Sequence, residues 1–162
     1  YFILIYFLIF ISCTISNIQW KKFKIFLLTL LSIAILNNII WILKNHPYEN
    51  VYFNFFVKEP YQQFDLDWWG LSNNEQIKFI LENDKRKTVT VMAVSGTSLE
   101  ATRKNMLSNE NKKRLIVVYN IKDANYLINN YINNKKDYSN TYKKINEIIV
   151  SGKPINTLYK IN

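Results

Sequence analysis

Two long stretches almost without charge open the chain and constrain its fold more than any other feature. Residues 1–18 carry no charged side chain, and residues 23–43 carry only Lys24, near their start. A membrane-spanning helix needs about 20 predominantly apolar residues. The sequence therefore predicts two transmembrane helices, at about 1–18 and 23–43. A cleaved signal peptide does not fit the first stretch, which is too long, lacks a basic start and is followed by a second apolar stretch.

The connector between the two stretches predicts their orientation. Its sequence, QWKKFK, holds Lys21, Lys22 and Lys24. Short loops rich in lysine stay on the cytoplasmic side of a membrane. We therefore expect a hairpin that enters from the cytoplasm, with residues 45–162 on the extracytoplasmic side of the inner membrane. Trp20 and Trp41 lie near opposite ends of the spans, where indole rings favour the membrane interface.

Adjacent amides interrupt the second apolar stretch at Asn37 and Asn38. An amide in a lipid environment needs a hydrogen-bond partner. We favour a bond to a neighbouring helix over the alternative, in which the two amides line a polar cavity for a substrate or a lipid phosphate.

Charge is distributed unevenly along the 162 residues, whose net charge is +9. Residues 1–44 hold four lysines and no acid, whereas the remaining 118 hold 17 basic and 12 acidic residues. The basic residues are scattered among asparagines rather than gathered in an arginine-rich stripe, so we expect no nucleic-acid partner. Anionic lipid headgroups are the expected partner of the basic residues near the membrane.

The chain has a single cysteine, Cys13, which excludes an intramolecular disulfide and a cysteine metal cluster.

After an aromatic loop at 45–71, interrupted by Pro47 and Pro60, the pattern becomes that of a small α/β domain at 72–162. The spacing predicts a helix over SNNEQIKFILEND capped by Ser72, strands at 88–94 and 114–119, and between them a helix capped by Ser98 or Thr97. Residues 122–132 are ambiguous, and we favour a strand. A terminal hairpin is expected around Ser151-Gly152-Lys153. The predicted fold is a membrane α-helical hairpin, the end of a polytopic bundle, followed by an α/β domain with a mixed sheet.

Few residues suggest chemistry. The three glycines do not allow a glycine-rich phosphate loop, and an ordinary strand-to-helix turn is the favoured interpretation of AVSGTS. His46 is the only histidine, which excludes a site built from several histidines. It can pair with Asp65 or Asp67 as an acid–base couple, although a contact with a headgroup or a carbonyl is the favoured interpretation. We expect no metal and no cofactor.

Two acids and two indoles follow one another in DLDWWG. Asp65 and Asp67 point to the same face if the segment is extended, where they can share a proton or a divalent ion. They can equally cap the following helix. Trp68 and Trp69 can stack on a sugar ring, anchor the chain at a membrane interface or pack in a core. We favour a structural role, in which these residues join the soluble domain to the membrane part of the protein.

Several segments of the chain, foremost HPYENVYFN and FDLDWWGLSNNEQIKFI, resemble the C-terminal part of bacterial polytopic glycosyltransferases. These enzymes form the protein O-mannosyltransferase and aminoarabinose-transferase-like superfamily, which has the GT-C membrane fold. The resemblance covers the last span and nearly all of residues 45–162. It departs from the family pattern at Asp65, where glutamate is common, and at Trp68, where tyrosine is common.

The resemblance implies a transferase that moves a sugar from a polyprenyl-phosphate donor to a glycan, lipid or protein acceptor outside the cytoplasmic membrane. In that family the catalytic acid lies in the first extracytoplasmic loop. Because the chain begins at Tyr1 in apolar sequence, we expect it to be the end of a longer chain that carries this loop, and we assign no catalytic residue here. Pocket-wall candidates are His46, Tyr48, Asn54, Asn37 and Asn38, and candidates for a domain seam or for sugar stacking are Asp65, Asp67, Trp68 and Trp69.

Two other functions remain open. One is a non-enzymatic protein in which two spans anchor an external domain that binds a partner or a cell-wall glycan. The other is a basic domain that faces the cytosol and contacts nucleic acid, which requires the opposite topology.

Overall fold

The computed structural model describes residues 2–53, 57, 60–94 and 98–161. The chain divides into two compact units, Tyr1–His46 and Pro47–Asn162, which we call the helical unit and the globular unit. The boundary falls where the predicted second span ends and the predicted aromatic loop begins.

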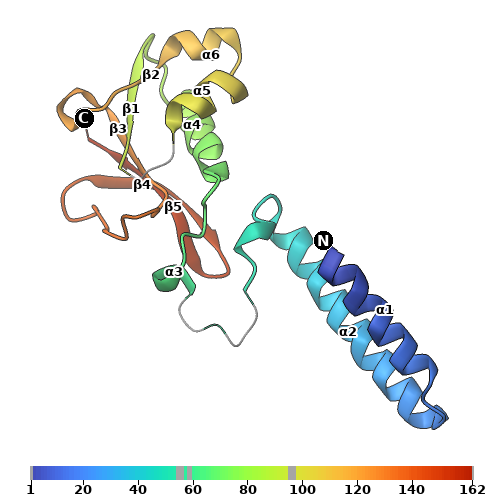
Figure 1. Ribbon diagram of the computed structural model, residues 1–162. Coiled ribbons are helices and arrows are strands. Elements are labelled where there is room, and N and C mark those ends of the chain that lie inside the picture. The colour runs from blue at the N-terminus through green and yellow to red at the C-terminus, as the bar shows by residue number, and fades with distance from the viewer. Residues whose placement is uncertain (1, 54–56, 58–59, 95–97, 162) are drawn as a thin grey trace. The chain divides into compact units, whose positions relative to one another are not determined.

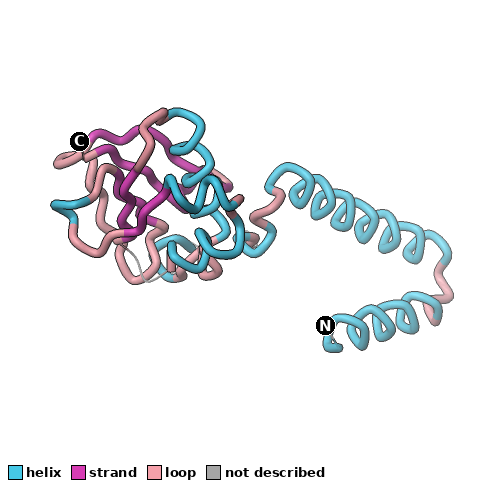
Figure 2. Tube along the Cα trace, turned by 90° about the horizontal axis from the view of Figure 1, so that it is seen from above, coloured by secondary structure: helices cyan, strands magenta, loops and turns pink. Residues whose placement is uncertain are grey.

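The helical unit consists of α1 (Phe2–Ser16) and α2 (Lys21–Asn45), joined by a short connection so that α1 runs back along α2 (Figure 1). The two axes diverge away from this connection (Figure 2). An apolar groove of about 390 Å³ lies between Phe10, Ile11 and Ile15 of α1 and Leu27, Leu30 and Leu31 of α2. Helical spacing of three to four residues places each set on one side of its helix.

Hydroxyl groups within the helical unit are satisfied by the helices themselves. Thr14 donates to the carbonyl oxygen of Phe10 at 2.8 Å, and Thr29 and Ser32 donate to the carbonyls of Ile25 and Leu28, each at 2.9 Å. Such bonds to the preceding turn remove the need for water at these positions. The hydroxyls of Thr29 and Ser32 on α2 are therefore compatible with an apolar environment.

Only α2, among the helices of the described residues, is long and apolar enough to cross a membrane. Its 25 residues extend about 37 Å, more than the roughly 30 Å of a hydrocarbon core, and none of them is buried. The 15 residues of α1 extend about 22 Å, which is short of that thickness. The predicted membrane hairpin is thus supported in part: α2 meets the requirement for a span, and insertion of both helices stays a prediction.

The globular unit is built on one mixed five-stranded sheet, of order β2-β1-β3-β5-β4 (Figure 1). Its strands are β1 (Val89–Ala93), β2 (Leu115–Val117), β3 (Tyr126–Asn129), β4 (Lys143–Val150) and β5 (Lys153–Lys160). β1 pairs in parallel with β2 and β3, whereas β5 pairs antiparallel with β3 and β4. The remaining described elements are η1 (Glu49–Val51), α3 (Pro60–Gln63), α4 (Leu71–Asn83), α5 (Leu99–Met106), α6 (Asn109–Arg114) and η2 (Ile121–Asp123).

One face of the sheet forms the hydrophobic core with α4 and α5. Alternate strand residues point toward these helices, because successive side chains of a strand lie on opposite faces. The core contains Ile77 and Ile80 of α4 and Leu99 of α5, packed against strand residues that include Val91 and Ile128. Each of these side chains is almost completely buried, so this face supplies much of the stability of the unit.

The opposite face of β3 and β5 is covered by the loop between β3 and β4. Tyr131 and Ile132 of this loop are buried. The Tyr131 hydroxyl lies 2.6 Å from the hydroxyl of Thr157, and the Tyr159 hydroxyl donates to Asp137 at 2.8 Å. The loop therefore acts as a cover held by specific polar contacts.

Most predicted elements are confirmed. The ambiguous segment 122–132 contains β3, and the terminal hairpin is β4–β5. Ser151 (φ 50°) and Gly152 (φ 75°) both have positive φ in its two-residue turn, as a tight hairpin turn of the primed type requires. Ser98 caps α5 by accepting the N–H of Ala101, whereas Thr97 lies outside the described residues. The helix α6 was not predicted from the sequence.

Candidate functional site

A turn at residues 66–70, immediately before α4, is organised by the carboxylate of Asp67. Its Oδ1 accepts the N–H of Leu71 at 2.9 Å, and its Oδ2 accepts the hydroxyl of Ser72. Gly70 closes the turn by donating its N–H to the Asp67 carbonyl at 2.8 Å, with φ 65°. Asp67 thus satisfies the first N–H of α4, whose N-cap residue is Gly70. The prediction that Ser72 is the cap was wrong, because the helix already begins at Leu71 and Ser72 is a donor within its first turn.

Buried amides tie this turn to the sheet. Asn156 of β5 donates to Ser72 Oγ at 2.7 Å and to Asn73 Oδ1 at 2.9 Å. Asn130, which follows β3, donates to the Asp67 carbonyl at 3.3 Å. All of these side chains are buried. Because Asn130 directly follows the carboxyl end of β3, the turn lies at the end of the parallel strands where open α/β sheets bind their ligands.

Asp67 is buried and surrounded by hydrogen-bond donors. Its side chain is 0% exposed. Burial raises the pKa of its carboxyl above the ordinary value, and the hydrogen bonds from Ser72, Asn130 and Leu71 oppose that rise. A carboxyl group with no solvent access and three donors around it serves to fix the backbone.

Asp65 has separate partners. Lys135 Nζ lies 2.8 Å from its Oδ1 and holds the pKa of the carboxyl below its ordinary value. Residues 66–69 form a turn, so the condition under which Asp65 and Asp67 would share a face, an extended segment, is not met. No group of three or more histidine, cysteine, aspartate or glutamate side chains that can hold a metal ion occurs within the described parts of the chain.

The fixed turn displays both indoles. Trp68 is 60% exposed and Trp69 is 76% exposed, so neither packs in the core. The interpretation of these residues as core is therefore wrong. Sugar stacking, interfacial anchoring and a domain seam stay predictions.

Trp69 lines a groove of about 220 Å³ between the start of α4 and α5. Gly70, Leu71 and Asn74 line it beside Trp69, and the other wall is a single face of α5, formed by Ala101, Thr102, Asn105 and Met106. The spacing of these four α5 residues matches one side of a helix. Trp68 is not part of the lining. The groove is our candidate functional site.

The chemistry of the groove is neutral and amphipathic. Its lining combines the indole of Trp69 and the side chains of Leu71 and Met106 with two amides and a hydroxyl, and none of the described residues that line it is ionisable. The Oδ1 atom of Asn74 is buried and accepts no hydrogen bond from the described part of the protein. A buried acceptor of this kind is costly unless a ligand or water satisfies it.

The α5 wall was not predicted from the sequence. Thr102 and Asn105 occur in a stretch that reads only as a polar helix, and nothing in the spacing indicates what lies opposite. The only residue in the sequence that could have indicated a groove on this helix face was the small residue Ala101, one turn before Asn105.

The predicted pocket-wall residues do not form one described site. Tyr48 is buried in the globular unit and donates its hydroxyl to Glu75 of α4 at 2.5 Å. Burial, together with this bond to Glu75, raises the pKa of Tyr48. His46 ends the helical unit, and Asn54 lies outside the described residues. A common pocket wall stays a prediction.

Asn37 and Asn38 are both exposed on α2. Adjacent helix residues point about 100° apart, so the two amides cannot both face one partner in the same way. Neither the helix-contact nor the polar-cavity interpretation is tested by the helical unit alone.

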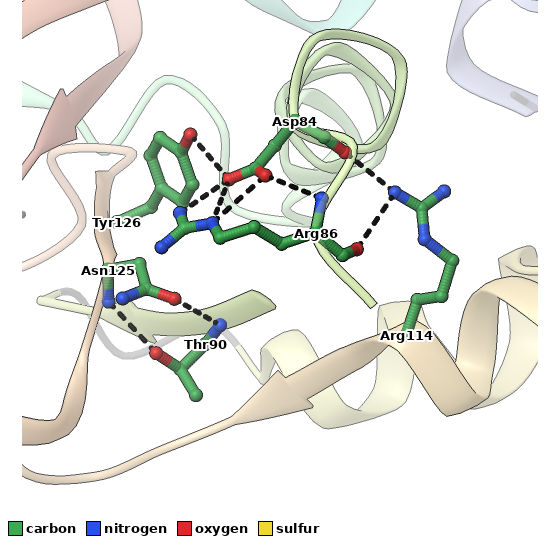
Figure 3. Close-up of polar contacts among 6 residues, drawn as sticks. All are labelled: Asp84, Arg86, Thr90, Arg114, Asn125 and Tyr126. Atoms are coloured by element: carbon green, nitrogen blue, oxygen red, sulfur yellow. Dashed lines mark hydrogen bonds and ion pairs between the residues drawn. The ribbon is translucent and has the colours of Figure 1, made fainter. Parts of the chain in front are cut away.

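A second polar cluster lies at the other end of α4 (Figure 3). Asp84 accepts hydrogen bonds from Arg86 Nε, at 2.9 Å and 3.0 Å, and from the Tyr126 hydroxyl at 2.9 Å, and these donors hold the pKa of its carboxyl well below the ordinary value. Arg114 donates to the Asp84 carbonyl at 2.6 Å. The cluster joins the end of α4 to the starts of β2 and β3, opposite the ligand-binding end of such sheets, so we interpret it as structural.

Comparison of the chain with protein-family models, with curated proteins and with solved structures finds no match.

Proposed function

We infer that this chain is the C-terminal part of an integral-membrane glycosyltransferase that moves a sugar from a polyprenyl-phosphate donor to an acceptor outside the cytoplasmic membrane. The membrane location in this inference is supported by α2, a helix of 25 residues with no buried side chain, followed by a folded globular unit. The transferase activity rests on the sequence resemblance alone. In water, the exposed side chains of Phe26, Ile33 and Leu36 would be unfavourable, whereas in lipid they are stabilising.

The sequence segments HPYENVYFN and FDLDWWG support the assignment to this class, through their resemblance to the C-terminal part of bacterial polytopic glycosyltransferases. The lysines in the first turn of α2, Lys21, Lys22 and Lys24, support a cytoplasmic location for that end of the helix and an extracytoplasmic location for the globular unit. Transfer from a lipid-linked donor needs a general base and charge stabilisation for the phosphate leaving group. We assign both to segments of the longer protein.

Transfer by membranes that contain the longer protein tests this function. Membranes are incubated with a radiolabelled polyprenyl-phosphate sugar, and the label that leaves the lipid fraction is counted. His46→Ala should lower transfer, whereas Lys113→Ala, which changes an exposed residue of α6, should not. Absence of transfer from polyprenyl-phosphate hexoses and pentoses, at normal expression, would contradict the proposal.

A second function is a non-enzymatic membrane-anchored domain that binds a glycan. One observation favours it: the described residues that line the groove beside Trp69 include no ionisable side chain, which suits binding better than acid–base chemistry. Under the first function this same groove assists a reaction that occurs elsewhere. Under the second function binding is the whole activity.

A further inference from the structure

We propose that the groove between α4 and α5 is a binding subsite for one neutral pyranose ring of a glycan, stacked on Trp69. The inference takes from the proposed function only the expectation that glycans are present on the same side of the membrane. Everything else in it follows from the groove itself.

The size of the groove favours a single ring. Its volume of about 220 Å³ is below the 300–1,000 Å³ or so of pockets that enclose a whole drug-sized ligand. An open site of that size can hold one sugar unit while the neighbouring units of the glycan remain in solvent. An extended peptide strand would need a longer groove.

The lining favours a neutral ligand with many hydroxyl groups. Asn74, Thr102 and Asn105 offer both donors and acceptors, and no lining residue carries a charge. A phosphate, a uronic acid or an acidic peptide would find no cation in this lining.

Trp69 supplies the apolar surface of the site. One face of a pyranose ring presents C–H groups, and an indole offers a large flat apolar area against which that face packs. Trp69 is 76% exposed although the backbone around it is fixed by the buried carboxylate of Asp67. The indole is thus presented on a rigid turn, which lowers the entropy lost on binding.

Trp68 provides a matched control. It is the next residue in the same turn and is 60% exposed, yet it does not line the groove. A glycan that binds the groove should therefore depend on Trp69 and not on Trp68. Binding to exposed aromatic residues in general would depend on both.

The test uses the full chain in lipid nanodiscs and saturation-transfer NMR. The probes are three neutral trisaccharides, of mannose, of glucose and of N-acetylglucosamine, with a galacturonic acid trisaccharide as the charged comparison. We expect at least one neutral trisaccharide to bind, and the charged one to bind more weakly. Trp69→Ala should weaken binding by about tenfold, the scale of one lost aromatic contact, while Trp68→Ala leaves it unchanged. Thr102→Val, which removes one hydroxyl at nearly constant volume, should also weaken binding.

Three results would overturn the inference: no binding of any neutral trisaccharide, equal losses in the Trp68 and Trp69 variants, or an apolar peptide that binds the groove where the sugars do not. Amide hydrogen exchange of α4 in each variant establishes that the fold is retained, so that a loss of binding is a property of the site.

Binding and transfer are separable. If trisaccharides bind through Trp69 but the longer protein transfers no sugar, the proposed transferase function fails and the subsite stands. If transfer occurs but Trp69→Ala changes neither trisaccharide binding nor transfer, the subsite fails and the transferase function stands.

Discussion

Replacement of Asp67 by alanine should destabilise the globular unit more than any other single change in the turn at 66–70. The carboxylate accepts the N–H of Leu71 at 2.9 Å and the hydroxyl of Ser72, and Asn130 lies 3.5 Å from its Oδ2. Alanine leaves these donors without their acceptor in a buried region.

The magnitude follows from the separate contributions. Loss of a helix cap costs about 0.5–2 kcal/mol, and a buried hydroxyl left unsatisfied costs about 1–3 kcal/mol. The variant also avoids the cost of burying a carboxyl group, which offsets part of the loss. We expect a net decrease of about 2–4 kcal/mol in the free energy of unfolding, which is a large part of the stability of a small domain.

Amide hydrogen exchange of residues 71–83, measured on the full chain in nanodiscs, reports the opening free energy of α4 without interference from the helical unit. Asp65→Ala is the control, because its ion pair with Lys135 is partly exposed and contributes at most about 1 kcal/mol. The reasoning would be refuted if Asp67→Ala changed the opening free energy by less than about 0.5 kcal/mol, which is the scatter of ordinary surface substitutions. It would also be refuted if Asp65→Ala were equally damaging.

Three further predictions concern other features of the globular unit. The pKa of Asp67 is raised in the folded protein, so the folded state holds its proton more tightly than the unfolded chain does. The free energy of unfolding should therefore fall as the pH rises above about 4. In urea titrations, Asp67→Asn should reduce this dependence of the unfolding free energy on pH. The pKa of Asp84 is lowered in the folded protein, so Asp84→Ala should cost about 1–3 kcal/mol at pH 7. The cost should fall below about pH 4, where acid protonates this carboxyl in the unfolded chain but not yet in the folded one, and equal costs at pH 7 and pH 2 would contradict this. Gly152→Ala should cost about 1 kcal/mol in thermal unfolding because φ is +75° there, although the added Cβ meets no atom within 4 Å; no loss would mean that the turn relaxes.

The sequence predicted the elements of the globular unit well because their signals are local. β-branched runs bounded by polar residues indicated β1 and β2, and the Ser151-Gly152 pair indicated the turn of the terminal hairpin. The order of the strands was beyond prediction, since β3 lies beside β5 only through pairing across residues distant in the chain. The short helix α6 was missed because its sequence, NENKKR, has no apolar periodicity.

The sequence indicated part of the candidate site for the same reason. DLDWWG drew attention to the turn that carries Trp69, and a contact of Asp67 with the start of the following helix was among the roles left open for it. What could not be predicted was the pairing of Trp69 with α5, more than 30 residues further along the chain, because this contact depends on how α4 and α5 pack on the sheet. The wrong choice of Ser72 as the cap has a local cause. Serine is strongly favoured at caps, whereas the actual N-cap is Gly70 and the first N–H of α4 is satisfied by Asp67 from within the preceding turn.

The central claim, that α2 crosses a membrane and leaves the globular unit outside, is tested most directly by cysteine labelling. The native Cys13 is replaced by serine, and a single cysteine is introduced as Lys22→Cys or Lys113→Cys, both at exposed positions. Spheroplasts that express each variant are treated with a membrane-impermeant maleimide. We expect the Lys113 variant to be labelled in intact spheroplasts and the Lys22 variant to be labelled only after lysis. The reverse pattern, or recovery of the protein in the supernatant after high-speed centrifugation without detergent, would contradict the account.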